Sequence, residues 1–193
     1  MTMAKLAIII PTYKHNVFVV EAIESALAQD LLLDYAIIMV NDGCPFPETQ
    51  SVGRAFRAKF PEIFHYLEKP NGGLSSARNA GIDYALREFP NLELIYFLDA
   101  DNRLRPTSLS NAEQLMRKTG ADWIYPSINM IGLEQGFSYY GKYSKLIHRE
   151  QNLCEAGSLI KADIVRCGLR FDENISEENN LTSKYDGKVE IED

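Results

Sequence analysis

Two carboxylates follow directly on an apolar segment near the middle of the chain. Residues 94–98 form the run Leu-Ile-Tyr-Phe-Leu, and Asp99, Ala100 and Asp101 come next. The run is typical of a buried strand, and ligands of open α/β sheets sit beyond the carboxyl ends of the strands. Because two like charges this close repel each other, they require a positive partner. A divalent cation, Mn²⁺ or Mg²⁺, that holds a phosphorylated substrate is the natural candidate.

Two earlier apolar runs, residues 6–11 and 35–40, are also typical of buried strands. The residues at and just after their ends are Pro11, Thr12 and Tyr13 for the first run and Asn41, Asp42 and Gly43 for the second. The carboxyl ends of parallel strands lie along one edge of a sheet, so these residues should share a pocket with the Asp-x-Asp pair. Taken alone, an Asp-Gly pair is an ordinary turn signal, and only its place after a strand favours a functional role.

Strand and helix patterns alternate along the first half of the chain. Further strands are expected over residues 63–67, 92–98 and 122–127, with weaker signals at 128–131 and 157–160. Helices are expected over 16–29 with Asn16 as N-cap, 48–59, 75–87, 106–118 and 162–167, while 136–148 has no clean periodicity. The alternation predicts an α/β fold in which helices cover a mostly parallel sheet.

The charge of the chain is concentrated at its C-terminal end. Of the net charge of −7 over 193 residues, −6 falls between positions 172 and 193, where eight acidic residues face two lysines. The rest of the chain is nearly neutral, which gives no support to a nucleic-acid partner. We therefore expect one domain over residues 1–173 and an acidic tail over 174–193, as loop, disorder or the end of a truncation.

The sequence contains no apolar run near the ~20 residues that a transmembrane helix needs. We expect a cytoplasmic chain, and peripheral association with the inner membrane face stays open as an alternative. Cys44, Cys154 and Cys167 are odd in number and form no Cys-x-x-Cys pair, so neither a disulfide framework nor a zinc site is implied.

Five segments, taken in order, resemble the nucleotide-binding part of the inverting family 2 glycosyltransferases. They are Ile-Ile-Ile-Pro-Thr-Tyr at 8–13, Val-Asn-Asp-Gly at 40–43, Asn-Gly-Gly followed by Ala-Arg-Asn-Ala-Gly within 71–81, Phe-Leu-Asp-Ala-Asp at 97–101 and Gly-Leu-Arg-Phe-Asp-Glu at 168–173. The resemblance implies the GT-A fold, a Rossmann-like three-layer α/β/α sandwich with a mostly parallel central sheet.

The resemblance also implies the residues of the base pocket. Pro11, Thr12 and Tyr13 would line the nucleobase, with the tyrosine ring available for stacking. Asp42 would accept a hydrogen bond from a base N–H, which distinguishes uracil from cytosine. Asn71, in a loop that is also a common turn sequence, would contact the nucleotide.

At the other end of the nucleotide, the resemblance makes Asp101 a direct metal ligand. Asp99 would bond the ribose or reach the cation through water, and Ala100 would lie against the nucleotide. Arg78 would reach the diphosphate or brace the carboxylates, although a solvated helix arginine is the plain alternative.

The implied reaction transfers a sugar from a nucleotide-diphosphate donor, expected to be a UDP-sugar, to a glycan or lipid-linked acceptor with inversion, as in polysaccharide biosynthesis. Inversion requires a general base, which the family usually takes from an acidic pair that is followed by an aromatic residue. Glu177-Glu178 lacks that aromatic neighbour, and Glu192 and Asp193 are weak candidates because they stand at the end of the sequence, rather distant from residue 173. A truncated or inactive nucleotide-sugar-binding domain is therefore an alternative. A haloacid-dehalogenase-like phosphatase also uses Asp-x-Asp, but Asn102-Arg103 stands where it needs Gly-Thr.

Overall fold

The computed structural model describes residues 3–15, 17–126, 157–174 and 189–192 of the 193-residue chain. Its strands are β1 (Leu6–Thr12), β2 (Tyr35–Asp42), β3 (Phe64–Lys69), β4 (Leu94–Phe97), β5 (Trp123–Pro126), β6 (Leu159–Lys161) and β7 (Val189–Glu192). Its helices are α1 (Phe18–Leu27), α2 (Pro47–Lys59), α3 (Leu74–Glu88), α4 (Ser108–Thr119) and α6 (Ala162–Arg166).

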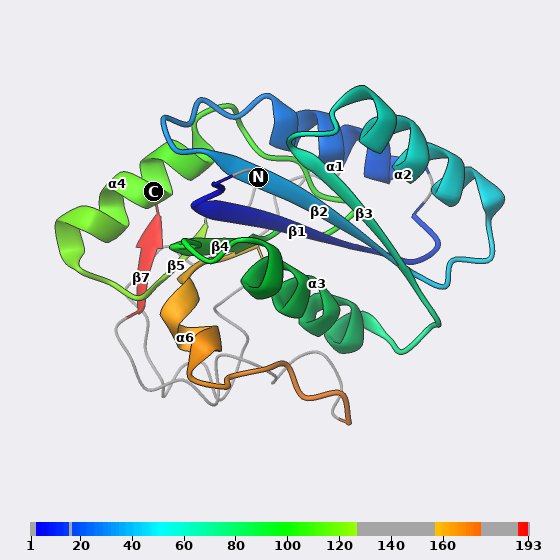
Figure 1. The fold of residues 1–193 in the computed structure, drawn as a ribbon. Helices are drawn as coiled ribbons and strands as arrows, with labels where there is room; N and C mark the ends of the chain where they lie inside the picture. The colour runs from blue at the N-terminus through cyan, green and yellow to red at the C-terminus, as the bar shows by residue number, and fades with distance from the viewer. Residues whose placement is uncertain (1–2, 16, 127–156, 175–188, 193) are drawn as a thin grey trace, which may run out of the picture.

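All strands of the described residues join one sheet of seven, in the order β3-β2-β1-β4-β6-β5-β7 (Figure 1). β1 pairs in parallel with β2 and β4, β2 with β3, and β5 with β7. Only β6 runs the other way, since it is antiparallel to both β4 and β5. The other six strands therefore point in one direction, and their carboxyl ends share one edge of the sheet.

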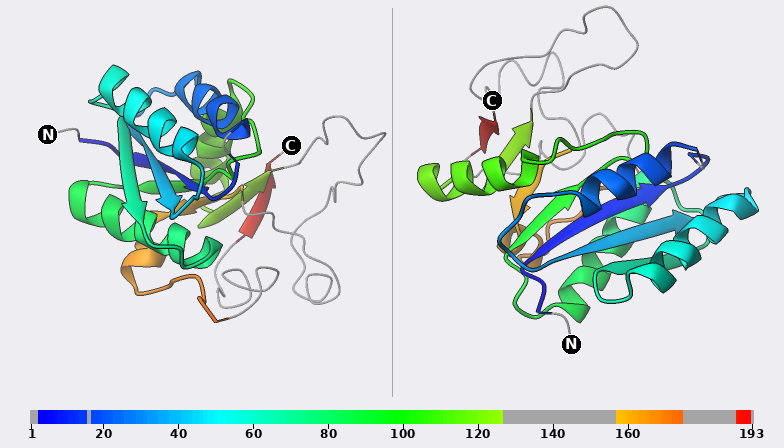
Figure 2. Two further views of the ribbon diagram at one scale, coloured as in Figure 1. Left: turned by 90° about the vertical axis from the view of Figure 1, so that its right-hand side faces the viewer. Right: turned by 90° about the horizontal axis from the view of Figure 1, so that it is seen from above.

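Helices cover both faces of the sheet, which gives three layers (Figures 1 and 2). In β1, Leu6, Ile8 and Ile10 pack into the core under α1, α2 and α4. The alternate residues Ala7 and Ile9 pack into the core under α3 and α6. This period of two follows from the pleat of a strand that is buried on both sides. The predicted α/β/α sandwich with a mostly parallel sheet is confirmed.

A close approach between α3 and β1 sets the position of the site. Gly81 lies against Ile9, and a Cβ atom added at this glycine would stand 2.5 Å from Ile9 Cγ2. The missing side chain lets α3 lie close on the sheet. α3 thereby packs on β1 and β2, and its N-terminal half lies near their carboxyl ends.

The structure differs from the sequence expectations at a few places. Residues 189–192 form a strand on the edge of the sheet, where loop was expected. α1 begins at Phe18 after Val17, which makes no side-chain cap, and the expected cap Asn16 lies outside the described residues. The segments 128–131 and 136–148 also lie outside them. Among the helices that the structure describes, none is long and apolar enough to cross a membrane.

Candidate functional site

The predicted site residues gather at the carboxyl edge of three adjacent strands. Pro11 and Thr12 end β1, Asp42 is the last residue of β2, and Asp99 to Asp101 form the turn that follows β4. Because β1 lies between β2 and β4 in the sheet, these three ends are direct neighbours. The expected juxtaposition of the strand ends is confirmed.

Asp42 organises the loop between β3 and α3. Its side chain is 2% exposed and forms an ion pair with Lys69, with 2.5 Å between Nζ and Oδ1. Asn71 Nδ2 donates to Oδ2 at 3.1 Å and to the Asp42 carbonyl at 2.9 Å. The backbone N–H of Gly72 lies 3.1 Å from each carboxylate oxygen, and that of Gly73 lies 2.8 Å from Oδ2.

This arrangement occupies the carboxylate almost completely. A carboxylate offers about four lone-pair directions, and donors from Lys69, Asn71, Gly72 and Gly73 already approach it. The donors fix the start of α3 relative to the end of β2. A base N–H would have to compete with the donors of the chain itself, so the role of Asp42 in reading the base stays a prediction.

Arg78 is a buried residue of α3 that points to the end of β4. It is 5% exposed, and its Nη2 donates to Asp99 Oδ1 at 2.8 Å, while the Asp99 side chain is 27% exposed. The guanidinium carbon also lies 5.1 Å from the centre of the Phe171 ring, within the range of cation–π attraction. The alternative of a solvated helix arginine is therefore wrong: Arg78 braces a carboxylate of the Asp-x-Asp pair.

The two aspartates of the pair have different surroundings. The Asp99 carboxylate forms an ion pair with Arg78. The backbone carbonyl of Asp99 accepts a hydrogen bond from the N–H of Asn102 at 3.0 Å, which closes the turn. Ala100 is 3% exposed and anchors the turn in the core, whereas Asp101 is exposed. Asp101 is thus the carboxylate of this turn that faces solvent.

The pair fits a divalent cation only together with ligands from outside the chain. Within the described ranges there is no group of three or more His, Cys, Asp or Glu residues that could hold a metal. Mg²⁺ commonly takes one or two protein carboxylates and completes its shell with substrate phosphates and water. Asp101, with Asp99 beside it, meets this requirement.

The end of β1 is held against the end of β2 through a cysteine. Lys14 has a φ of 61°, and its N–H donates to Cys44 Sγ at 3.3 Å. Burial raises the pKa of the Cys44 thiol, but hydrogen bonds that involve Thr49 and backbone groups outweigh it, so the pKa is lowered. The residue before Lys14, Tyr13, is 38% exposed, while Thr12 is buried.

The two candidate general bases lie on the far strand or outside the described residues. Glu192 ends β7, whose carboxyl end is on the same edge of the sheet as that of β4. Two strands, β6 and β5, separate β7 from β4, which corresponds to about 14 Å at the usual strand spacing. Asp193 lies outside the described residues, so both candidates stay predictions.

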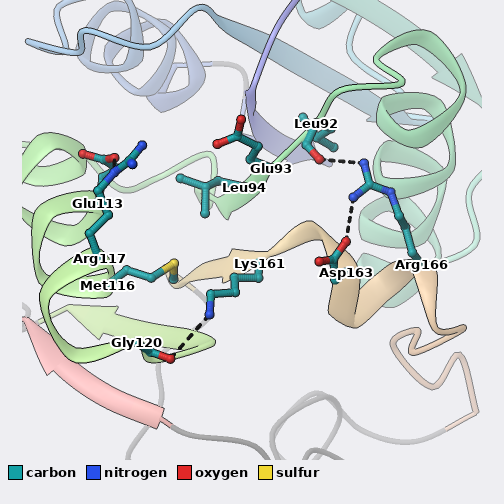
Figure 3. Close-up of a pocket in the computed structure, with 10 residues that line it drawn as sticks. All are labelled: Leu92, Glu93, Leu94, Glu113, Met116, Arg117, Gly120, Lys161, Asp163 and Arg166. Atoms are coloured by element: carbon teal, nitrogen blue, oxygen red, sulfur yellow. Dashed lines mark hydrogen bonds and ion pairs between the residues drawn. The ribbon is translucent and has the colours of Figure 1, made fainter.

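A pocket of about 370 Å³ opens at the opposite edge of the sheet (Figure 3). It lies at the start of β4, the end of β6 and the C-terminal end of α4. Its charged groups pair among themselves or with nearby residues, since Arg166 bonds Asp163 at 2.8 Å and Lys161 bonds Asp122 at 2.7 Å. Because it is remote from the carboxyl edge, it plays no part in the site built around Asp99.

Residues 7–172 match the family described as glycosyl transferase family 2. The chain belongs to this family. The match includes all three strand ends, and it argues against a haloacid-dehalogenase-like phosphatase.

Curated relatives of this glycosyltransferase family are longer than the chain. It is 29% identical over 191 residues to the GalNAc(5)-diNAcBac-PP-undecaprenol beta-1,3-glucosyltransferase of Campylobacter jejuni. The match covers 96% of the chain and 50% of that relative. It is 33% identical over 106 residues to the minor teichoic acid biosynthesis protein GgaB of Bacillus subtilis, and this match covers 54% of the chain and 11% of GgaB. The chain thus spans half or less of the length of these two relatives.

Solved structures confirm the GT-A fold. The chain matches S. aureus TarS 1-349 in complex with UDP-GlcNAc with a TM-score of 0.71 and 16% identity, over 98% of the chain and 59% of TarS 1-349. It matches the mannosyltransferase PcManGT from Pyrobaculum calidifontis, in complex with GDP-Man and Mn²⁺, with a TM-score of 0.68 and 15% identity. This match covers 91% of the chain and 49% of PcManGT.

Sequence reasoning gives no role to two residues that shape the candidate site. Lys69 was missed because the third strand was expected to end at residue 67, whereas β3 continues through Lys69. Asn79 lies in the Ala-Arg-Asn-Ala-Gly segment, and the resemblance implies no role for it. Its side chain accepts the N–H of Phe171 at 2.9 Å and donates to the Phe171 carbonyl at 2.9 Å. These hydrogen bonds, which we call the clamp on Phe171, join residues 92 positions apart, so no local sequence pattern predicts them.

Proposed function

We propose that the chain binds a uridine diphosphate sugar together with Mn²⁺ or Mg²⁺ at the carboxyl edge of its sheet. It would serve the transfer of the sugar, with inversion, to a hydroxyl group of a glycan or lipid-linked acceptor. The observation that carries this proposal is the pairing of buried Arg78 with Asp99 beside exposed Asp101 at the end of β4. A braced carboxylate next to a free one is suited to a cation-bound diphosphate.

The residues of the turn after β4 would bind the cation and the sugar-phosphate part of the nucleotide. Asp101 would hold the cation directly, and Asp99, kept in place by Arg78, would bond the ribose or reach the cation through water. When bound, the cation neutralises the charge that builds on the departing diphosphate. Ala100 lies in the same turn and would contact the nucleotide through its backbone.

The base would occupy the β1 and β2 side of the same edge. The half-exposed ring of Tyr13 is available for stacking, with Pro11 and Thr12 as the buried wall beneath it. Asn71, fixed by its bonds to Asp42, stands at the far side. UDP-GlcNAc in TarS supports a uridine donor, and GDP-Man in PcManGT marks the competing choice of base.

The names of two relatives support the proposed class of acceptor. The names of the C. jejuni and B. subtilis relatives refer to an undecaprenol-linked glycan and to teichoic acid. A chain of this kind would act in the cytoplasm, peripherally at the inner membrane face, where lipid-linked acceptors are available. Glu192 and Asp193 remain the candidates for the general base.

Binding without turnover is the second candidate function, because β6 and β5 separate the strand that carries Glu192, a candidate general base, from β4. Release of UDP from a UDP-sugar, measured with and without an undecaprenol-linked or teichoic acid acceptor, separates the two. Acceptor-dependent release supports transfer, whereas tight donor binding without release supports a binding domain.

Titration with UDP in the presence and absence of Mn²⁺ tests the binding site itself. We expect Mn²⁺-dependent binding that Asp101→Ala weakens by about 10-fold or more, since even groups that only support a metal ligand often change affinity about 10–100-fold. Asp163→Ala is the matched control, because Asp163 is an exposed aspartate at the opposite edge of the sheet. Metal-independent binding that persists in Asp101→Ala would remove the proposed metal site.

A further inference from the structure

Lys69 is placed at the base end of the candidate site by the pairing of β3 with β2. It is the last residue of β3 and the register partner of Asp42. Its ammonium group contacts Asp42 Oδ1 at 2.5 Å and the carbonyl of Pro70 at 2.8 Å. The side chain is 23% exposed, so it is partly buried but still reaches the surface of the edge.

One donor of this ammonium group is left for a ligand. A lysine ammonium has three N–H groups and no acceptor. Two of the three are directed to Asp42 and Pro70, and no acceptor for the third is found among the residues that the structure describes. Because Asp42 already receives donors from the following loop, Lys69 is the group of this pair with bonding capacity to spare.

The strand order places Lys69 at the correct end of a bound nucleotide. The cation site lies at β4 and Lys69 at β3, with β1 and β2 between them. Three strand spacings amount to about 14 Å, a span that an extended nucleoside diphosphate covers from its phosphates to the far edge of its base. Tyr13, at the end of β1, lies between the two.

We propose that Lys69 determines the base specificity of the site by donating a hydrogen bond to the O4 carbonyl of uracil. Uracil presents an acceptor at this position, whereas cytosine presents an amino group, which is a donor. Since an ammonium group can only donate, it bonds uracil and leaves the cytosine amino group without a partner. This inference rests on the proposed function, namely that the edge binds a uridine nucleotide.

Binding of UDP and of CDP, each measured by calorimetry in Mn²⁺ with the full chain, tests the inference. For the wild-type chain we expect a preference for UDP. Lys69→Met keeps the stem of the side chain and removes the donor, so UDP affinity should fall about 10-fold or more while CDP affinity changes little. Lys69→Gln keeps an amide donor for uracil but adds an acceptor that a cytosine amino group can use, so the affinity for CDP should rise and the preference for UDP over CDP should narrow.

Lys118→Met is the matched control, because it removes the same charge from an exposed position in the last turn of α4. It should leave both affinities unchanged. If the wild-type chain binds UDP but either has no preference over CDP or keeps its preference in both Lys69 variants, the inference is overturned. If the wild-type chain binds neither nucleotide, the proposed function itself fails. Thermal melting shows whether each variant is folded. If Lys69→Met does not fold, the UDP and CDP affinities of Lys69→Gln decide the test.

Discussion

Replacement of Asn79 by alanine should destabilise the fold through a defined set of lost hydrogen bonds. The Asn79 side chain satisfies both the N–H and the carbonyl of Phe171, each at 2.9 Å, and also donates to Glu173 Oε1 at 2.9 Å. Asn79 and Phe171 are both 8% exposed, so water replaces these bonds poorly. An unsatisfied buried polar group costs about 1–3 kcal/mol.

The two backbone groups of Phe171 therefore set the expected magnitude. We expect Asn79→Ala to lower the free energy of unfolding by about 2–6 kcal/mol, measured by urea denaturation. Glu173 adds little, because it is exposed and water can take the place of Asn79. The Phe171 ring lies against Arg78, so UDP affinity should also fall modestly.

A matched variant separates this effect from the general loss of an asparagine. Asn91 is exposed, and its amide contacts only the Met3 sulfur, at 3.7 Å, among the contacts described for it. Asn91→Ala should stay within about 0.5 kcal/mol of the wild-type chain. If Asn79→Ala and Asn91→Ala have the same stability, the clamp on Phe171 contributes nothing and the reasoning is refuted.

Three further perturbations test other parts of the site and the core. Gly43→Ala should cost about 1–3 kcal/mol in denaturation experiments, because φ is +66° and the new Cβ would stand 2.6 Å from Asn71 N; Gly120→Ala, with φ +69° and open space, should cost less. Burial lowers the pKa of His65 below 6.5. The unfolded chain then takes up the proton first, so wild-type stability should fall as the pH drops through 6.5. His65→Gln should lack that component when melting is followed from pH 7.5 to 5.5. Tyr13→Ala should weaken UDP binding about 10-fold, whereas Tyr13→Phe should retain it; equal affinities of the two variants would exclude stacking.

The sheet was predictable because its signals are local. The runs that became β1, β2 and β4 are apolar throughout, as strands buried on both faces require. The polar residues after them mark the edge where the strands end. Since parallel strands share that edge, the convergence of Asp42 and Asp99 followed from the sequence as well.

What the sequence did not reveal depends on contacts between distant residues. β7 is a four-residue edge strand in an acidic segment, and it exists only through its pairing with β5. The engagement of Asp42 by the loop after β3 joins residues about thirty positions apart. Arg78 showed no sign of burial in a helix of mixed composition, and its role emerges only from contact with Asp99 and Phe171.

The ion pairs of the edge explain why a cation would bind at one end and a base at the other. Asp42 is neutralised by Lys69, and Asp99 is neutralised by Arg78. Asp101 forms no ion pair within the described part of the chain, and it is exposed. Of these three aspartates, it alone keeps an uncompensated charge, and the field that attracts a divalent cation is therefore centred at the end of β4. At the β2 and β3 end the charges cancel, which favours a neutral, hydrogen-bonding group such as a nucleobase over a phosphate. The orientation of the nucleotide thus follows from which carboxylates the chain itself has paired.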